Sequence, residues 1–139
     1  MSGELTKRLV RSEVEFKETF GGFVVGSPDG RYMAVARDHD LSLWDLREGR
    51  LCMKVDRTTG CIPAFIPGAE PAILYGTRDG ELFSVRPVNR SPQERLVGIA
   101  PHRIRRIEVS PDGATVAVSD VDLKVSVFAN WRHCDTASP

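Results

Sequence analysis

The stretch SPDGRYMAVARDHDLSLWD, from Ser27 to Asp45, decides the fold of this 139-residue chain. A Ser-Pro-Asp-Gly turn leads into an alternating apolar run that begins at Tyr32, and a second turn around Asp38 leads into a run that ends at Trp44. Alternation with a period of two is typical of half-buried β-strands. Two such runs joined by tight turns therefore predict antiparallel strands.

The pattern recurs along the chain. The same turn returns as Ser110-Pro111-Asp112-Gly113, 83 residues after the first, which is two periods of 41 to 42 residues. A degenerate middle version of the turn, Ile66-Pro67-Gly68-Ala69-Glu70, lies between them. Each copy also has an Asp six residues before the end of its last apolar run: Asp38 before Trp44, Asp79 before Val85, and Asp122 before Phe128. A repeat of this length with four short strands is the signature of a β-propeller.

On these landmarks, from about Leu9 to Phe128, the chain resembles the WD-repeat β-propeller family. The resemblance implies an all-β fold of three four-stranded antiparallel blades, a partial propeller, at 9–128, between a disordered N-terminus at 1–8 and a polar C-terminal tail at 129–139. In the family, His, Ser or Thr, Asp and Trp form a hydrogen-bonded set within a blade. The third copy offers His102, Ser119 and Asp122, but Phe128 stands in the place of the Trp. We therefore expect blades held mainly by apolar packing, with a partial polar tie.

The period-two runs predict twelve strands. They are 9–17; then 23–26, 32–37, 41–46 and 51–56; then 62–66, 72–76, 81–86 and 95–99; and finally 104–109, 115–119 and 124–128. The proline-containing segment 87–94 is predicted to be a long, exposed loop. Between the second and third strands, Asp38, Asp79 and Asp122 are expected to accept backbone N–H bonds and fix the turns, and Trp44 is expected to be structural.

The strand count leads to a hypothesis about assembly. Three blades fall short of the four to eight that a closed propeller usually has. An edge carrying Val10, Val14 and Phe16 in one chain would therefore pair with the edge carrying Val125 and Val127 in another, and two chains would close a six-blade homodimer. The chain as a fragment of a longer propeller, a subunit completed by another protein, and an open monomer remain alternatives.

Composition and charge exclude some function classes. The 19 basic and 19 acidic side chains cancel, and the sequence pI is about 6.8, which argues against nucleic-acid binding. No apolar run reaches the roughly 20 residues of a membrane span, and no signal-peptide pattern opens the chain, so a cytoplasmic protein without a membrane partner is expected. The three cysteines and three histidines follow no metal-ligand spacing, and no nucleophile stands in a motif with a base. We expect no enzyme activity, no metal and no cofactor.

The resemblance implies a non-catalytic scaffold that binds protein or peptide partners. In the family, the narrow face around the central channel binds peptides through residues beside the turn Asp and at the start of the inner strand. Those positions hold Arg37 and Arg78, with Arg103 and Arg105 around the third inner strand. Guanidinium groups at one rim would suit an acidic or phosphorylated peptide. The alternative is a structural subunit whose exposed blade edges are its only interaction surfaces.

Overall fold

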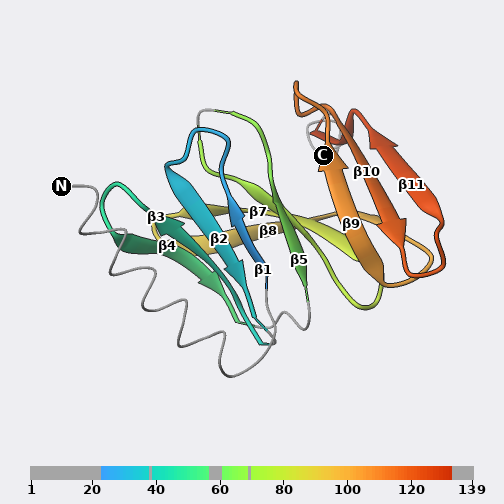
Figure 1. The fold of residues 1–139 in the computed structure, drawn as a ribbon, viewed down its shortest axis with the longest axis horizontal. Helices are drawn as coiled ribbons and strands as arrows, with labels where there is room; N and C mark the ends of the chain where they lie inside the picture. The colour runs from blue at the N-terminus through green and yellow to red at the C-terminus, as the bar shows by residue number, and fades with distance from the viewer. Residues whose placement is uncertain (1–22, 38, 57–60, 69, 133–139) are drawn as a thin grey trace.

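The computed structural model describes residues 23–37, 39–56, 61–68 and 70–132. This part of the chain forms eleven strands: β1 (Phe23–Gly26), β2 (Tyr32–Ala36), β3 (Leu41–Asp45), β4 (Arg50–Val55), β5 (Ile62–Phe65), β6 (Ile73–Gly76), β7 (Glu81–Val88), β8 (Ser91–Ile99), β9 (Ile104–Val109), β10 (Thr115–Asp120) and β11 (Val125–Ala129). They build three antiparallel meanders in chain order, β1 to β4, β5 to β8 and β9 to β11, which lie side by side (Figure 1). The predicted all-β fold of propeller blades is confirmed, but among the described residues the third sheet has three strands where four were predicted.

The first Ser-Pro-Asp-Gly turn is closed by its own side chains. Ser27 Oγ accepts a hydrogen bond from the Tyr32 N–H at 2.9 Å and donates one to Asp29 Oδ1 at 2.7 Å. The Asp29 carboxylate also accepts from the Arg31 N–H, and these two bonds hold the pKa of Asp29 below its ordinary value. Gly30 has a φ of 76°, which a residue with a side chain rarely adopts.

The turn at Ser110 has the same hydrogen bonds. Ser110 Oγ accepts from the Thr115 N–H at 3.0 Å and donates to Asp112 Oδ1 at 2.6 Å, and Gly113 has a φ of 75°. The repeat seen in the sequence is therefore a repeat of the bonds that turn the inner strand into the second one.

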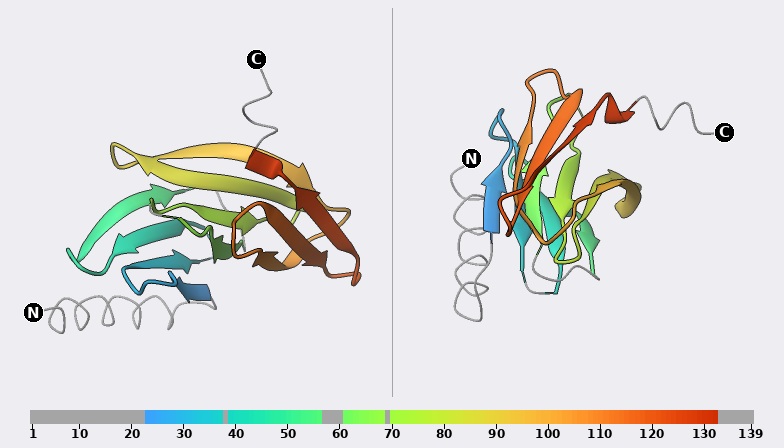
Figure 2. Two further views of the ribbon diagram at one scale, coloured as in Figure 1. Left: turned by 90° about the horizontal axis from the view of Figure 1, so that it is seen from above. Right: turned by 90° about the vertical axis from the view of Figure 1, so that its right-hand side faces the viewer.

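Most strands begin and end within one residue of the predicted bounds, but the exposed loop predicted at 87–94 is wrong. Strands β7 and β8 continue until Val88 pairs with Ser91, so the turn is an Asn-Arg pair with φ angles of 53° and 67°. Two consecutive positive φ angles are those of the type I′ turn that matches strand twist. Pro87 faces Pro92, in the pair next to Val88 and Ser91. Alternate pairs of an antiparallel ladder form no N–H hydrogen bonds with each other, so prolines are tolerated in this pair. The hairpin forms one long ribbon beside β4 (Figure 2).

The middle sheet is buried on both faces because side chains of β6 alternate between two cores. Ile73 and Tyr75 pack with Leu41 and Leu43 of the first sheet. Leu74, between them, packs with residues of the third sheet, including Ile104, Ile107, Val116 and Val118. All four residues of β6 are buried, so the middle sheet depends on both neighbours.

Close approach of the second and third sheets depends on glycines. A Cβ atom on Gly76 would lie 2.5 Å from Cγ2 of Ile104, and one on Gly98 would overlap the ring of Phe128. Small residues at these two positions therefore allow β9 and β11 to pack directly on the middle sheet. The packed region continues beyond residue 128, because Trp131 is buried in the second core.

The end of β3 carries a buried carboxylate that organises the turn into β4. Asp45 is 4% exposed, and its Oδ1 accepts from the N–H groups of Arg47 and Glu48 at 2.9 and 3.2 Å. Its Oδ2 accepts from Nη2 of Arg31 at 3.2 Å. Burial raises the pKa of Asp45, but the bond from Arg31 and the two backbone bonds outweigh it, so the pKa lies below its ordinary value.

Replacing Gly76 by Ala is expected to lower the free energy of unfolding by about 1–3 kcal/mol, the usual cost of overpacking a close-packed site. Gly26→Ala is the matched control, because no neighbouring atom of the described residues lies within 4 Å of its Cβ position, and it should change stability by less than about 0.5 kcal/mol. Urea unfolding followed by circular dichroism measures both. Equal effects of the two substitutions would contradict the close approach of β6 to Ile104.

Asp45→Asn should destabilise the protein by about 1–2 kcal/mol at pH 7, because hydrogen bonds to a charged acceptor are lost. A carboxyl whose pKa in the folded protein is lower than its unfolded value of about 3.9 stabilises the fold when it is charged. This stabilisation is fully present above the unfolded pKa and is lost as the pH falls through the folded pKa. The difference between the two proteins should therefore shrink below about pH 4. Unfolding curves measured from pH 7 to pH 2.5 test this, and a constant difference would refute it.

Candidate protein-binding surfaces

The turns between the second and third strands are fixed by the residue at the end of the second strand. In the middle sheet, Thr77 Oγ1 accepts from the N–H groups of Asp79 and Glu81 at 3.2 and 3.1 Å. In the third sheet, Asp120 Oδ1 accepts from the N–H groups two and four residues later, at 2.9 and 3.0 Å. The residues Thr77 and Asp120 thus play the same part in the two blades.

The expected role of Asp79 and Asp122 as the turn acceptors is therefore wrong. The N–H groups of the turn converge on the side chain two residues earlier, whereas the carboxylate of Asp122 pairs with Nε2 of His102 at 3.0 Å. Asp38, the corresponding residue of the first copy, lies outside the described residues. The pair of His102 with Asp122 is one part of the polar set that the resemblance implied for a blade.

Trp44 supplies another part of such a set, in a different blade. Its Nε1 donates to Ser42 Oγ at 3.0 Å, and Ser42 Oγ donates to the carbonyl of Val35 at 3.5 Å. Trp44 thus joins β3 to β2 within the first sheet. Each of these two polar interactions is only part of the hydrogen-bonded set that the resemblance implied. The two continuous apolar cores provide most of the packing between sheets.

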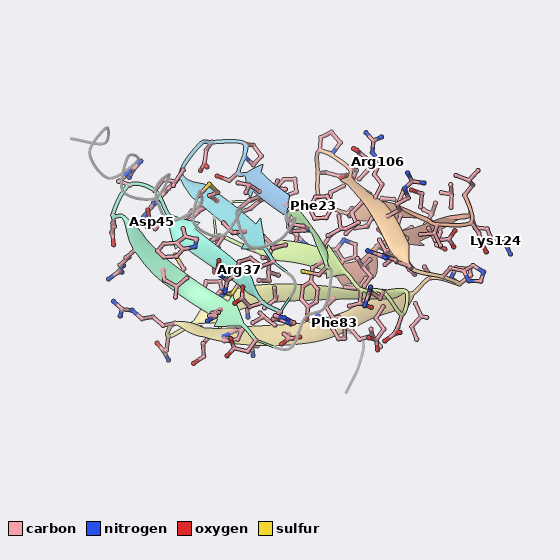
Figure 3. All side chains as sticks on the ribbon, turned by 60° about the horizontal axis from the view of Figure 1, so that its bottom comes forward. Phe23, Arg37, Asp45, Phe83, Arg106 and Lys124 are labelled. Atoms are coloured by element: carbon pink, nitrogen blue, oxygen red, sulfur yellow. The ribbon has the colours of Figure 1, made fainter. Side chains whose placement is uncertain are left out.

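The expected equivalence of Arg37 and Arg78 is not found. Arg37 donates hydrogen bonds to both carboxylate oxygens of Asp40, at 2.9 and 2.5 Å. The turn between β2 and β3, which carries both residues, is one residue shorter than the corresponding turns of the other sheets. The Arg37 N–H bonds to the Asp40 carbonyl, as the Thr77 N–H bonds to that of Glu81. The Arg37 hydrogen bond is the main cause that holds the pKa of Asp40 below its ordinary value. Arg37 is therefore engaged within its own turn, at the opposite end of the first sheet from Asp45 (Figure 3).

Arg78 and Arg103 lie together at the seam between the second and third sheets. Both are exposed, and the segments that carry them are joined by a hydrogen bond from the Ile104 N–H to the Thr77 carbonyl at 3.2 Å. Arg105 is exposed two residues after Arg103. Arg37 is not part of this group of arginines.

The outer face of the third sheet is apolar and exposed. Val125 and Val127 are 67% and 61% exposed. Val125 occupies the same position in its blade as Leu41 and Leu82 do in theirs. Val125 pairs with Ser119, Leu41 with Ala36, and Leu82 with Gly76. Leu41 and Leu82 lie beneath the next sheet and are only 1% and 0% exposed. The third sheet thus presents, uncovered by any described residue, the face that each preceding sheet buries.

An edge accompanies this face. Strands β3 and β7 pair with β4 and β8, whereas β11 pairs only with β10 among the described residues. A strand with an unpaired row of backbone N–H and C=O groups is a template for another strand. Val10, Val14 and Phe16, expected to provide that strand, lie outside the described residues.

Leu123 marks the start of this edge and was not singled out by the sequence. It is 80% exposed and has a φ of 66°, where the middle sheet has Gly80 with a φ of 86°. A side chain in this region costs about 1–2 kcal/mol. Comparison of the two copies would have revealed the exchange of Gly for Leu, and a strained, exposed Leu is a functional signal when the site around it is uncovered.

The described part of the chain offers neither a metal site nor a membrane-spanning helix. No group of three or more His, Cys, Asp or Glu side chains within it could hold a metal ion. None of its helices is long and apolar enough to cross a membrane.

No protein-family model and no curated protein matches this sequence. A chain in the crystal structure of the mitotic checkpoint complex, an assembly that contains a β-propeller, is similar in fold, with a TM-score of 0.61 and 16% sequence identity. The match covers 76% of this chain and 35% of that chain, so this protein spans about a third of the structure it resembles. The likeness shows the fold, and it gives the three sheets their interpretation as propeller blades.

Asp120 provides a test of the turn. Asp120→Ala should destabilise the protein by about 1–2 kcal/mol, because two N–H groups lose their acceptor. Asp120→Thr copies Thr77 and removes Oδ2, a buried oxygen that has no hydrogen-bond partner among the described residues, so the stability of this variant should equal or exceed that of the wild type. Thermal unfolding compares the three proteins, and a Thr variant as unstable as the Ala variant would contradict the shared geometry.

Proposed function

We propose that this chain is a non-catalytic, protein-interaction scaffold of WD-repeat-like blades, whose third sheet is completed by β-structure from another polypeptide. A second copy of the chain is the partner that we propose first. The observation that carries the proposal is the exposure of Val125 at a position that both other blades bury completely, together with the exposure of Val127 two residues later on the same face.

Two features of the third sheet support a β-strand or a sheet as the binding partner. The backbone edge of β11 can add a strand, and the outer face can pack against a following blade. Burial of Val125, Val127 and Leu123 together would remove a contiguous apolar patch from water, which is the main driving force of association. The strain at Leu123 is then a cost that a partner's contacts offset.

A second copy can supply the missing layer from its first sheet. Phe23 and Val24 of β1 are 51% and 48% exposed at the other end of the array. Contact of the third sheet of one chain with the first sheet of another is head to tail, and two such contacts close a ring of six blades. Six blades lie within the usual range for a closed propeller.

The alternative is completion by a different polypeptide or by further blades of a longer chain. The match to 35% of the neighbour chain supports this alternative, because three blades correspond there to part of a larger chain. The exposed Arg78 and Arg103 would give either assembly a small basic rim, suited to an acidic peptide.

Light scattering over a range of concentrations tests self-assembly. The wild type should approach twice 15.4 kDa, and Val127→Lys should remain at the mass of one chain, because a charge on the buried face cannot be desolvated. Val88→Lys is the matched control, since Val88 is 42% exposed at the tip of the β7–β8 hairpin, and it should assemble normally. A wild type that stays at 15.4 kDa would exclude the homodimer and favour completion by another polypeptide.

Leu123→Gly separates folding from association. Relief of the positive φ should leave the monomer as stable as the wild type or stabilise it by about 1 kcal/mol. The same change removes an apolar contact, so the dimer dissociation constant should rise. Urea unfolding of the dilute protein and light scattering give the two quantities, and a loss of monomer stability would show that Leu123 serves the fold and not an interface.

A further inference from the structure

A second candidate site lies at the other end of the blades from the Arg78 rim. A groove of about 560 Å³ is bounded by the β5–β6 turn, the β7–β8 hairpin and the residues that follow β11. Its floor includes the half-buried apolar residues Pro67 and Ala72 and the buried Ile66 and Trp131. Trp131 Nε1 donates a hydrogen bond to the carbonyl of Gly113 at 3.0 Å.

The walls of the groove are basic. Arg86, Arg95 and Arg132 line it, and Glu70 is the one carboxylate among the described lining residues. Arg86 donates to the neutral amide of Gln93 at 3.4 Å, and Arg132 donates to the carbonyl of Pro67 at 3.5 Å. Within the described chain, neither guanidinium has a carboxylate within ion-pair distance. Positive charge is thus concentrated here in a protein whose formal net charge is zero.

We propose that this groove binds a short acidic peptide segment of a partner protein. Carboxylates of the peptide would accept hydrogen bonds from Arg86 and Arg132, and an apolar side chain between them would pack on the floor. The combination of an apolar floor with basic walls matches a segment in which acidic and apolar residues alternate. The inference does not require blade completion, because no lining residue of the groove belongs to β11.

The groove is less suited to other anions. Trp131 is 6% exposed and already hydrogen-bonded, so it offers little ring surface for stacking a nucleotide base. A small inorganic anion would leave the half-buried Pro67 and Ala72 of the floor in contact with water, whereas a peptide side chain would cover them.

Nuclear magnetic resonance of the indole N–H groups can test the site directly. The chain has two tryptophans, and Trp44 lies in the first sheet, bonded to Ser42, so it is an internal control. Titration with acetyl-Glu-Leu-Glu-Leu-amide should shift the Trp131 signal and leave that of Trp44 in place. The Gln-Leu-Gln-Leu peptide should give a dissociation constant at least tenfold higher.

Arginine variants locate the contact. Arg86→Gln should weaken the acidic peptide about two- to fivefold, the effect of one partly exposed ion pair. Arg106→Gln should not, because Arg106 lies on the third sheet and pairs with Glu108 (Figure 3). Equal weakening by the two variants, equal binding of the Gln peptide, or equal shifts of both indoles would overturn the proposal. If inorganic phosphate or a single-stranded oligonucleotide shifted the Trp131 signal at the same concentrations, the groove would bind anions in general and not an acidic peptide.

Discussion

Burial of both faces of a sheet is the constraint on which the rest of this structure depends. Strand β6 meets it completely, because alternate side chains enter the two cores on either side. The third sheet has the same alternation, yet its outer valines meet no described residue. The outer valines are exposed because the third sheet is the last of the three described sheets, and not because its alternation of apolar side chains differs.

The sequence predicted the blades well because turn chemistry and strand alternation are local. Ser27 and Ser110, with their Asp and Gly partners, form duplicate turns, and the period-two runs between them could be recognised without tertiary information. Segment 87–94 failed because its two prolines suggested a loop. Whether a proline disturbs a hairpin depends on which partner it faces, and cross-strand register is not visible in one strand alone.

The candidate sites were harder to predict because they depend on contacts between copies of the repeat. The turn acceptors were placed on Asp79 and Asp122, two residues beyond the side chains that accept the bonds, since both positions carry plausible polar residues. The rim lost Arg37 because Asp40 binds it, a pairing made possible by a shorter turn. The groove joins β7 and β8 to Trp131, nearly 40 residues away, and no motif links them.

The two-faced burial of the middle sheet also sets the order in which the molecule comes apart. An opening that separates β6 exposes both cores at once, whereas detachment of β11 breaks one strand pairing and opens only the second core. Coupling between neighbouring sheets then gives a gradient of protection from hydrogen exchange, highest in the centre and lowest at the outer edges. The strand that we propose to pair with a partner is thereby also the one that can rearrange at the least cost to the remaining structure.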